Sequence, residues 1–271
     1  MHPNLDMPIG IFDSGIGGLT VANAISHLLP NEKLVYFGDT AHFPYGEKSQ
    51  ESIRKYAIEI SDFLYHDKKC KAIVIACNTA SAAAYQELKE AFNQKIPIIN
   101  VIDPMVELLV NSNFSKIGII ATRGTISSGV YQEKITRRKK EQHFAALATP
   151  LLASMIEEHF LNNQISHAII QNYLEDPILN QINALVLACT HYPLIEKEIA
   201  NFYNPPITIL NSARVVADKL ALILEKEQLK QNKINNPTHE FFVSELTQNF
   251  NDSTQIFFGK QIELKEIKLN Y

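Results

Sequence analysis

One six-residue pattern, Ala-x-Val-x-Ala-Cys, occurs twice in this chain, at residues 72–77 and again at residues 184–189. In each copy an apolar run ends on a cysteine and polar residues follow, which is typical of a buried strand that leads into a helix. The two cysteines, Cys77 and Cys189, lie 112 residues apart. Cysteines at matching points of two similar segments indicate a duplicated architecture in which two thiols face one site.

Two further pairs of segments repeat at nearly the same distance. Residues 9–14 resemble residues 117–122, an offset of 108, and residues 96–101 resemble residues 207–212, an offset of 111. A single apolar run often matches another by chance, but an ordered series of three rarely does. The sequence therefore predicts an internal duplication.

Short β-branched runs alternate with longer amphipathic stretches, the pattern of strand–helix–strand units on a largely parallel sheet. The expected strands cover 8–12, 33–37, 72–76, 97–101, 116–120, 145–148, 184–188 and 207–210. The expected helices cover 17–29, 49–67, 79–93, 103–111, 128–142, 151–162, 166–174, 193–201 and 212–228. We predict an α/β fold of two similar parallel-sheet domains related by pseudo-two-fold symmetry, with the active site in the cleft between them.

The C-terminal tail contains the apolar run 240–244, a helical stretch near 245–257 and a final apolar segment at 262–269. Because the tail follows the second repeat, we expect it to return and complete the first domain. The predicted division is residues 1–98 plus 212–271 for a discontinuous first domain and residues 99–211 for the second.

Composition and charge exclude several classes of protein. The chain of 271 residues is 46% hydrophobic and 20% charged with a net charge of −4, which is ordinary for a soluble globular protein and gives no footprint for nucleic acid. The basic run 137–140 is interpreted as a solvated helix face. The N-terminal residues lack the regions of a signal peptide, and no apolar run reaches the ~18 residues of a membrane span. We expect a cytoplasmic protein.

Each of the two repeated cysteines follows a predicted buried strand, and ligands of open α/β sheets bind at the carboxyl ends of strands. Asn78 or Thr79 is expected to cap the first following helix and Thr190 the second, and a helix N-terminus favours a thiolate. The alternative is that both cysteines are small core residues, but their matching positions favour a shared site. With three cysteines and no Cys-x-x-Cys there is no disulfide framework or zinc spacing, and Cys70 is interpreted as structural.

Two glycine-containing loops follow the first two strands. In residues 13–18 the glycines allow backbone N–H groups to approach an anion, although the spacing matches no nucleotide-binding loop. Asp13 could orient a base or a substrate ammonium group, or simply cap a helix. In residues 38–46 the amides around Tyr45 and Gly46 could bind a second carboxylate; a purely structural turn is the alternative.

Two more residues are candidates for proton chemistry. His191, two residues after the second cysteine, can serve as a proton partner, although a lone histidine is more often a packing or surface residue. Glu157 follows a short apolar run and, taken alone, would be interpreted as an ordinary helix residue. The sequence carries no pyridoxal-type lysine motif, metal-ligand set or flavin fingerprint, so we expect neither a cofactor nor a metal.

Taken together, the motifs resemble the aspartate/glutamate racemase family, and within it the glutamate racemases, over essentially the whole chain. The residues that carry the resemblance are 10–21, 36–40 with 44–46, 76–80 and 189–194. Two positions depart from the family pattern: Thr149, where a cysteine is more usual, and Asn211, where many members have aspartate.

The resemblance implies cofactor-independent interconversion of L-glutamate and D-glutamate that supplies D-glutamate for peptidoglycan synthesis, by a homodimer whose partner is the small molecule glutamate. It implies that Cys77 and Cys189 are the two acid/base residues, Cys77 acting on D-glutamate and Cys189 on L-glutamate. Asp13 would support Cys77, and His191 with Glu157 would support Cys189. The implied substrate contacts are Asp13, Ser14, Pro44, Tyr45, Gly46, Cys77, Asn78, Thr79, Thr122, Thr125, Thr190 and His191.

Three alternatives remain open at the level of sequence. The first keeps the fold and changes the substrate, as in an aspartate racemase. The second is a cysteine nucleophile acting on an amide or ester, for which only Cys189 and its histidine would be essential. The third is a binding module without turnover.

Overall fold

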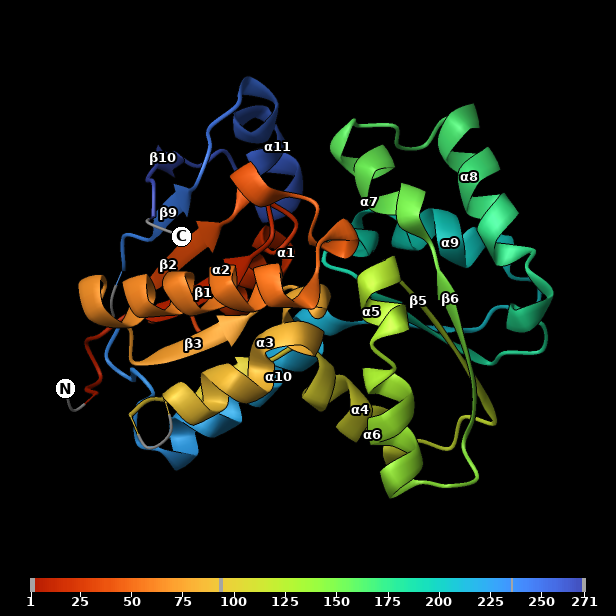
Figure 1. Cartoon of the computed structure of the whole chain (residues 1–271), viewed down its shortest axis with the longest axis horizontal. Coiled ribbons are helices and arrows are strands. Elements are labelled where there is room, and N and C mark those ends of the chain that lie inside the picture. The colour runs from red at the N-terminus through yellow and green to blue at the C-terminus, as the bar shows by residue number, and fades with distance from the viewer. Residues whose placement is uncertain (1–2, 93–94, 235, 270–271) are drawn as a thin grey trace.

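Two parallel sheets form the framework of the computed structural model, which describes residues 3–92, 95–234 and 236–269. The first sheet contains β1 (Ile9–Asp13), β2 (Leu34–Gly38), β3 (Ala72–Ile75), β4 (Ile98–Asn100), β9 (Glu240–Val243) and β10 (Lys265–Glu266). The second contains β5 (Lys116–Ala121), β6 (His143–Ala148), β7 (Ala184–Ala188) and β8 (Thr208–Asn211). The sheets belong to two α/β units that lie side by side, one with red, orange and blue segments and one green to teal (Figure 1).

The two sheets repeat the same strand order and the same register. The first has the order β10-β9-β2-β1-β3-β4 and the second has the order β6-β5-β7-β8. The last four strands of the first sheet, β2-β1-β3-β4, therefore correspond one to one to the four strands of the second. Ile9 pairs with Ala72 in the first sheet, and the equivalent residues Ile117 and Ala184 pair in the second. Every pairing between the described strands is parallel. The predicted fold class, two similar parallel-sheet α/β domains, is confirmed.

Helices surround both sheets. The α-helices are α1 (Leu19–Leu28), α2 (Gln50–Asp62), α3 (Asn78–Ala91), α4 (Ile102–Val110), α5 (Arg123–Ser127), α6 (Val130–Arg138), α7 (Pro150–Glu157), α8 (Gln164–Leu174), α9 (Glu196–Phe202), α10 (Ser212–Lys226) and α11 (Gln248–Phe258). Short 3-10 segments are η1 (Thr40–His42), η2 (Tyr45–Glu47), η4 (Pro177–Leu179) and η5 (Tyr192–Ile195), and η3 (Phe63–Asp67) is a π-helical turn. In the described chain no helix is long and apolar enough to cross a lipid bilayer.

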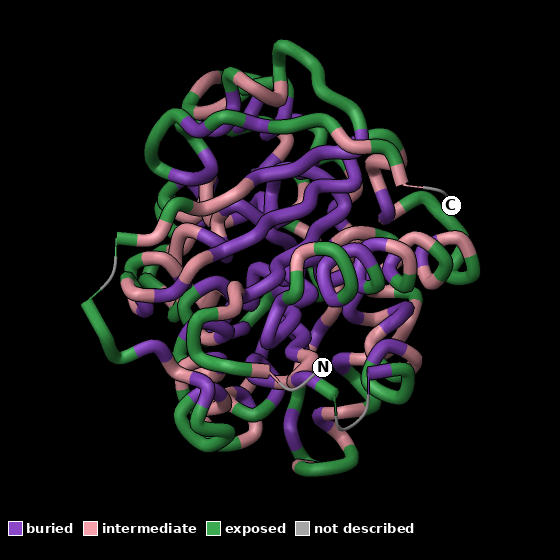
Figure 2. The backbone as a smooth tube through the Cα atoms, turned by 90° about the vertical axis from the view of Figure 1, so that its left-hand side faces the viewer, coloured by how far each residue is buried: buried purple, intermediate pink, exposed green. Residues whose placement is uncertain are grey.

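The first sheet is buried on both faces, as a parallel sheet requires. Alternate residues of β3 belong to different apolar layers: Ala72 and Val74 pack with residues of α1 and α10, while Ile73 and Ile75 pack with residues of α2 and α3. Figure 2 shows these buried strands crossing the interior, with the exposed segments at the periphery. The strands are therefore rigidly held, and the residues at their carboxyl ends are well positioned.

The boundaries differ from the predictions where glycine or the following strand interrupts a helix. The helix predicted at 128–142 is present over a shorter range, as α6: Gly129, in the left-handed region at φ 65°, separates it from α5, and it ends at Arg138, before β6 begins at His143. The helix predicted at 79–93 ends at Ala91, and residue 93 lies outside the described residues.

The tail returns to the first sheet, as expected. Strand β9 pairs with β2, β10 pairs with β9, and α11 contacts α1. A buried ion pair lies beside this return: Lys71 Nζ is 2.6 Å from Glu32 Oε2, and the N–H of Gln231 donates to Glu32 Oε1 at 2.8 Å. The segment after α10 is thereby tied to the first unit.

Candidate active site

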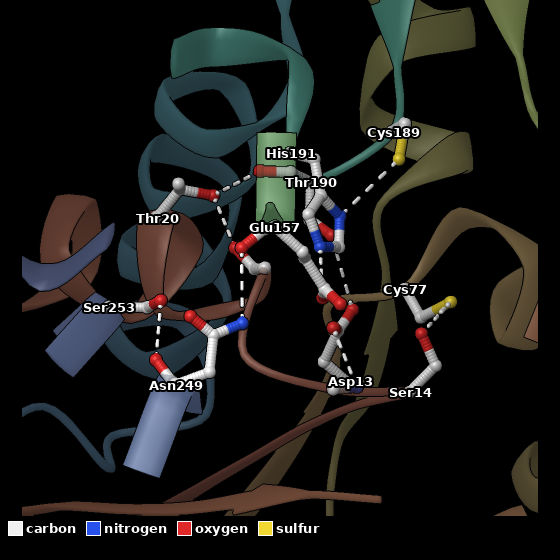
Figure 3. Close-up of polar contacts among 12 residues, drawn as sticks. Asp13, Ser14, Thr20, Cys77, Glu157, Cys189, Thr190, His191, Asn249 and Ser253 are labelled. Carbon is white, nitrogen blue, oxygen red and sulfur yellow. Dashed lines mark hydrogen bonds and ion pairs between the residues drawn. The ribbon is translucent and has the colours of Figure 1, made fainter. Parts of the chain in front are cut away.

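Cys77 and Cys189 line one cavity at the carboxyl ends of β3 and β7. The cavity has a volume of about 30 Å³, much smaller than a surface groove of about 440 Å³ beside β9. Figure 3 shows the cluster around the thiols, with Cys189 above and Cys77 below. The lining residues are Ser14, Phe43, Pro44, Tyr45, Gly46, Cys77, Asn78, Thr79, Thr122, Ala153, Ala188, Cys189, Thr190 and His191.

Cys77 is itself the N-cap of α3, because its Sγ accepts a hydrogen bond from the N–H of Ala80 at 3.4 Å. The prediction that Asn78 or Thr79 caps this helix is therefore wrong. The thiol also contacts Ser14, with Sγ 3.7 Å from Oγ. Burial, and secondarily the charge of Asp13, raises the pKa of Cys77 to about 12, and this outweighs the helix N-terminus that favours thiolate. Cys77 is held as a neutral thiol.

Cys189 lies at the end of a chain of buried polar groups. Its Sγ is 3.7 Å from Nδ1 of His191, and Nε2 of His191 is 2.7 Å from Oε1 of Glu157. Burial alone would lower the pKa of His191, but the hydrogen bonds to Cys189 and Glu157 and the charges of both groups raise it well above its ordinary value. The histidine is therefore an imidazolium, and this cation lies directly beside the sulfur of Cys189.

Asp13 lies at the end of β1 and is fully buried. Its Oδ2 accepts from the N–H of Gly15 at 3.1 Å and its Oδ1 from the hydroxyl of Thr190 at 3.3 Å. Thr190 therefore does not cap the following helix as predicted; η5 precedes α9, and its N-cap is His191. Burial raises the pKa of Asp13 and the charge of His191 opposes the shift. Asp13 acts on Cys77 through its charge, while Ser14 makes the contact with the sulfur.

A close backbone approach fixes the position of His191. A Cβ added to Gly17 would lie 2.7 Å from Oγ1 of Thr190 and even closer to the imidazole ring. Thr20, at the start of α1, donates to the carbonyl of Thr190 at 2.9 Å. The loop after β1 and the segment after β7 are thus in direct contact across the two units.

Most of the predicted site residues line the cavity, but two predicted substrate contacts, Asp13 and Thr125, and the predicted supporting residue Glu157 do not. Thr125 lies behind the cavity, with its Oγ1 3.3 Å from that of Thr79 and 3.1 Å from that of Thr122. Asp13 and Glu157 reach the cavity through Thr190 and His191 respectively. The structure therefore brings the predicted residues together, but these three contact residues of the cavity wall instead of lining the cavity themselves.

Sequence reasoning missed several residues around the site. Phe43, Ala153 and Ala188 line the cavity; the first belongs to the predicted loop and the last to the repeated hexad, so both were within reach of the motifs. Asn249, whose Nδ2 donates to the carbonyl of Glu157 at 3.2 Å, and Phe257, whose ring centroid is 5.4 Å from that of His191, come from α11. No motif marks these two residues.

The two departures from the family pattern have structural partners. Thr149 is fully buried, and its Oγ1 is 2.7 Å from the hydroxyl of Tyr192. Asn211 donates through Nδ2 to Glu196 at 2.6 Å. Both side chains lie outside the cavity lining. Among the described residues, no group of three His, Cys, Asp or Glu side chains is placed to hold a metal ion.

Two parallel α/β units with a cysteine from each on a common cavity describe a racemase-type site, and comparison with known proteins agrees. The chain belongs to the Asp/Glu/Hydantoin racemase family, whose model matches residues 19–220.

Within this family the chain is similar to glutamate racemases. It is 40% identical to glutamate racemase of Chlorobaculum tepidum over 265 residues, which is 97% of this chain and 96% of the relative. Glutamate racemase from Francisella tularensis in complex with D-glutamate superimposes with a TM-score of 0.89 at 36% identity, covering 97% of this chain and 98% of the other. The isoform RacE1 from Bacillus anthracis gives a TM-score of 0.91 at 33% identity, covering 98% of each. The predicted resemblance is confirmed.

Proposed function

We propose that this protein interconverts L-glutamate and D-glutamate without a cofactor, with Cys77 and Cys189 as its two acid/base residues. The observation that carries the proposal is that both thiols line one cavity, one from each repeated unit. Inversion of a stereocentre requires removal of a proton from one face and delivery of a proton to the other. Two groups on opposite sides of the α-carbon perform both steps directly.

The contacts of the two thiols favour one starting direction. Cys189, paired with the imidazolium of His191, takes the α-proton of L-glutamate. The electron pair of the broken C–H bond moves onto the α-carbon and its carboxylate, and then forms a new C–H bond with the proton of the Cys77 thiol on the opposite face. The products are D-glutamate, a thiol at Cys189 and a thiolate at Cys77. The reverse direction uses the two thiols with their roles exchanged.

The main barrier is the weak acidity of an α-hydrogen beside a carboxylate. Hydrogen bonds that strengthen as charge moves onto this carboxylate stabilise the transition state. The donors on the cavity wall include the Ser14 and Thr79 hydroxyls, the Asn78 amide and the backbone around Tyr45. We assign these donors to the two carboxylates of glutamate.

The narrow cavity requires the cleft to open for substrate to enter and product to leave. Contacts of α5 with α3 and η2 close the cleft in this structure. A closed, dry site strengthens the hydrogen bonds inside it. We propose that two domains move relative to each other when the cleft opens. One domain comprises residues 1–98 together with 212–271, and the other comprises residues 99–211.

From the resemblance to glutamate racemases we further propose that the product supplies peptidoglycan synthesis and that the enzyme is a homodimer. We also propose that it acts in the cytoplasm, a compartment in which free thiols stay reduced. Light scattering of the purified protein tests the dimer. A mass of a single chain would contradict it.

The proposed function is tested by circular dichroism of purified protein with L- and D-glutamate and with L- and D-aspartate, with no cofactor added. We expect the circular dichroism signal to decay to zero whether the reaction starts from L-glutamate or from D-glutamate. Turnover of aspartate alone would identify an aspartate racemase. Binding of glutamate without any turnover would indicate a binding module and contradict the proposal.

A further inference from the structure

One polar side chain on the cavity wall is only partly paired within the described part of the chain. Asn78 lines the cavity and is 3% exposed, and its Oδ1 accepts a hydrogen bond from the hydroxyl of Tyr131 at 2.9 Å. Its Nδ2 has no hydrogen-bond partner among the described residues. A buried donor left unpaired is costly. The Nδ2 group is therefore available for an acceptor that enters the cavity.

The bond from Tyr131 decides which end of the amide is available. An amide presents an acceptor oxygen at one end and a donor nitrogen at the other. Burial and the charge of Asp103 raise the pKa of Tyr131, so its hydroxyl keeps the proton that it donates. With Oδ1 occupied by this proton, the nitrogen is left for the cavity, and a carboxylate is bound by a donor.

This bond also crosses between the two units. Asn78 is the first residue of α3, whereas Tyr131 belongs to α6 in the second unit. Next to it, Oγ1 of Thr79 is 2.9 Å from Oγ1 of Thr122, which also belongs to the second unit. The amide is thus oriented by a bond that joins the two units across the closed cleft.

We propose that Tyr131 is a positioning residue for substrate, which orients Asn78 so that Nδ2 donates to a carboxylate of glutamate in the closed cleft. The inference rests on the proposed function for the identity of the ligand. Neither the hexad nor the loop motifs include Tyr131. Its role is to act through Asn78, without contact with the reacting atoms.

The test compares Tyr131→Phe with Tyr203→Phe. The Tyr203 hydroxyl is also buried and has no hydrogen-bond partner among the described residues, so its removal controls for loss of a buried phenol oxygen. We expect Tyr131→Phe to raise KM for both enantiomers, and the Kd of D-glutamate measured by calorimetry, by about fivefold with a smaller change in kcat. Tyr203→Phe should leave all three unchanged.

A double-mutant cycle with Asn78→Ala decides whether Tyr131 acts through the amide. We expect Tyr131→Phe to have no further effect on Kd once the amide is gone. An equal fivefold loss in both backgrounds, or a wild-type Kd in Tyr131→Phe, would overturn the inference. Absence of turnover in the wild type would contradict the proposed function instead, and the Kd cycle would still decide the role of Tyr131.

Discussion

Nε2 of His191 lies 2.7 Å from Oε1 of Glu157, and both side chains are almost completely buried. A carboxylate in this position keeps the imidazole protonated and aims its other nitrogen at Cys189. The pair comes from α7 and from the segment after β7, which lie 34 residues apart in sequence. The chemistry of Cys189 therefore depends on a residue that never touches the thiol.

We expect Glu157→Gln to lower kcat/KM by about one to two orders of magnitude, because a neutral amide no longer stabilises the imidazolium. The equilibrium constant of a racemisation is one, so the loss must be equal for L- and D-glutamate. Polarimetric rates from both enantiomers measure it. The exposed neighbour Glu158, changed to Gln, is the matched control. Unchanged rates in Glu157→Gln would contradict the role of the pair.

The pH dependence follows from the same contact. The pKa of His191 is raised, so the imidazolium is present below that pKa and is lost as the pH rises through it. We expect the rate from L-glutamate to fall on the alkaline side, and Glu157→Gln to move this fall to lower pH, since the charge that raises the pKa is removed. Rate profiles across the neutral and alkaline range test this. A shift to higher pH would contradict it.

Each of Cys77→Ala and Cys189→Ala should abolish racemisation and leave the fold intact. The small cavities cost about 1–3 kcal/mol of the free energy of unfolding. Cys70→Ala is the matched control, since Cys70 is also buried but lines no part of the site. Rates and denaturant unfolding of the three variants provide the measurement. Near-normal turnover in Cys77→Ala, with Cys189 essential, would indicate a single-nucleophile enzyme.

Gly17→Ala should inactivate the enzyme through His191. The added methyl group would collide with the imidazole ring and the Thr190 hydroxyl, so these two buried side chains would have to move. We expect a loss of kcat of about two orders of magnitude with only a small change in melting temperature. A variant with normal kcat would show that His191 tolerates displacement.

We expect the buried Lys71–Glu32 ion pair to contribute to the stability of the fold and not to catalysis. Its side chains are 0% and 1% exposed. Removing the cation by Lys71→Ala leaves a buried carboxylate unpaired, which costs about 3–5 kcal/mol. Arg137→Ala breaks the exposed pair with Glu133 and should cost less than about 1 kcal/mol. Urea unfolding of both variants compares them, and equal losses would contradict the assignment.

The two sheets and the positions of the two thiols could be predicted from the sequence, but the contacts between the two units could not. The hexads end on Cys77 and Cys189 because a strand followed by a helix is encoded locally, by apolar runs and polar residues. The cap on α3 was mispredicted because a thiol replaced the usual oxygen. Contacts such as Tyr131 with Asn78 or Asn249 with Glu157 join residues 53 and 92 positions apart, and tertiary packing alone creates them.

The most direct test of two thiols that act on opposite faces is turnover in heavy water. Early in the reaction from either enantiomer, before the reverse reaction contributes, the α-position of the product and of the remaining substrate is read by proton NMR. We predict deuterium in the product and hydrogen in the remaining substrate, because the thiol that delivers the new proton has exchanged with solvent. Product that retains the original α-hydrogen would mean that one group carries the proton between faces, and it would contradict the two-thiol account.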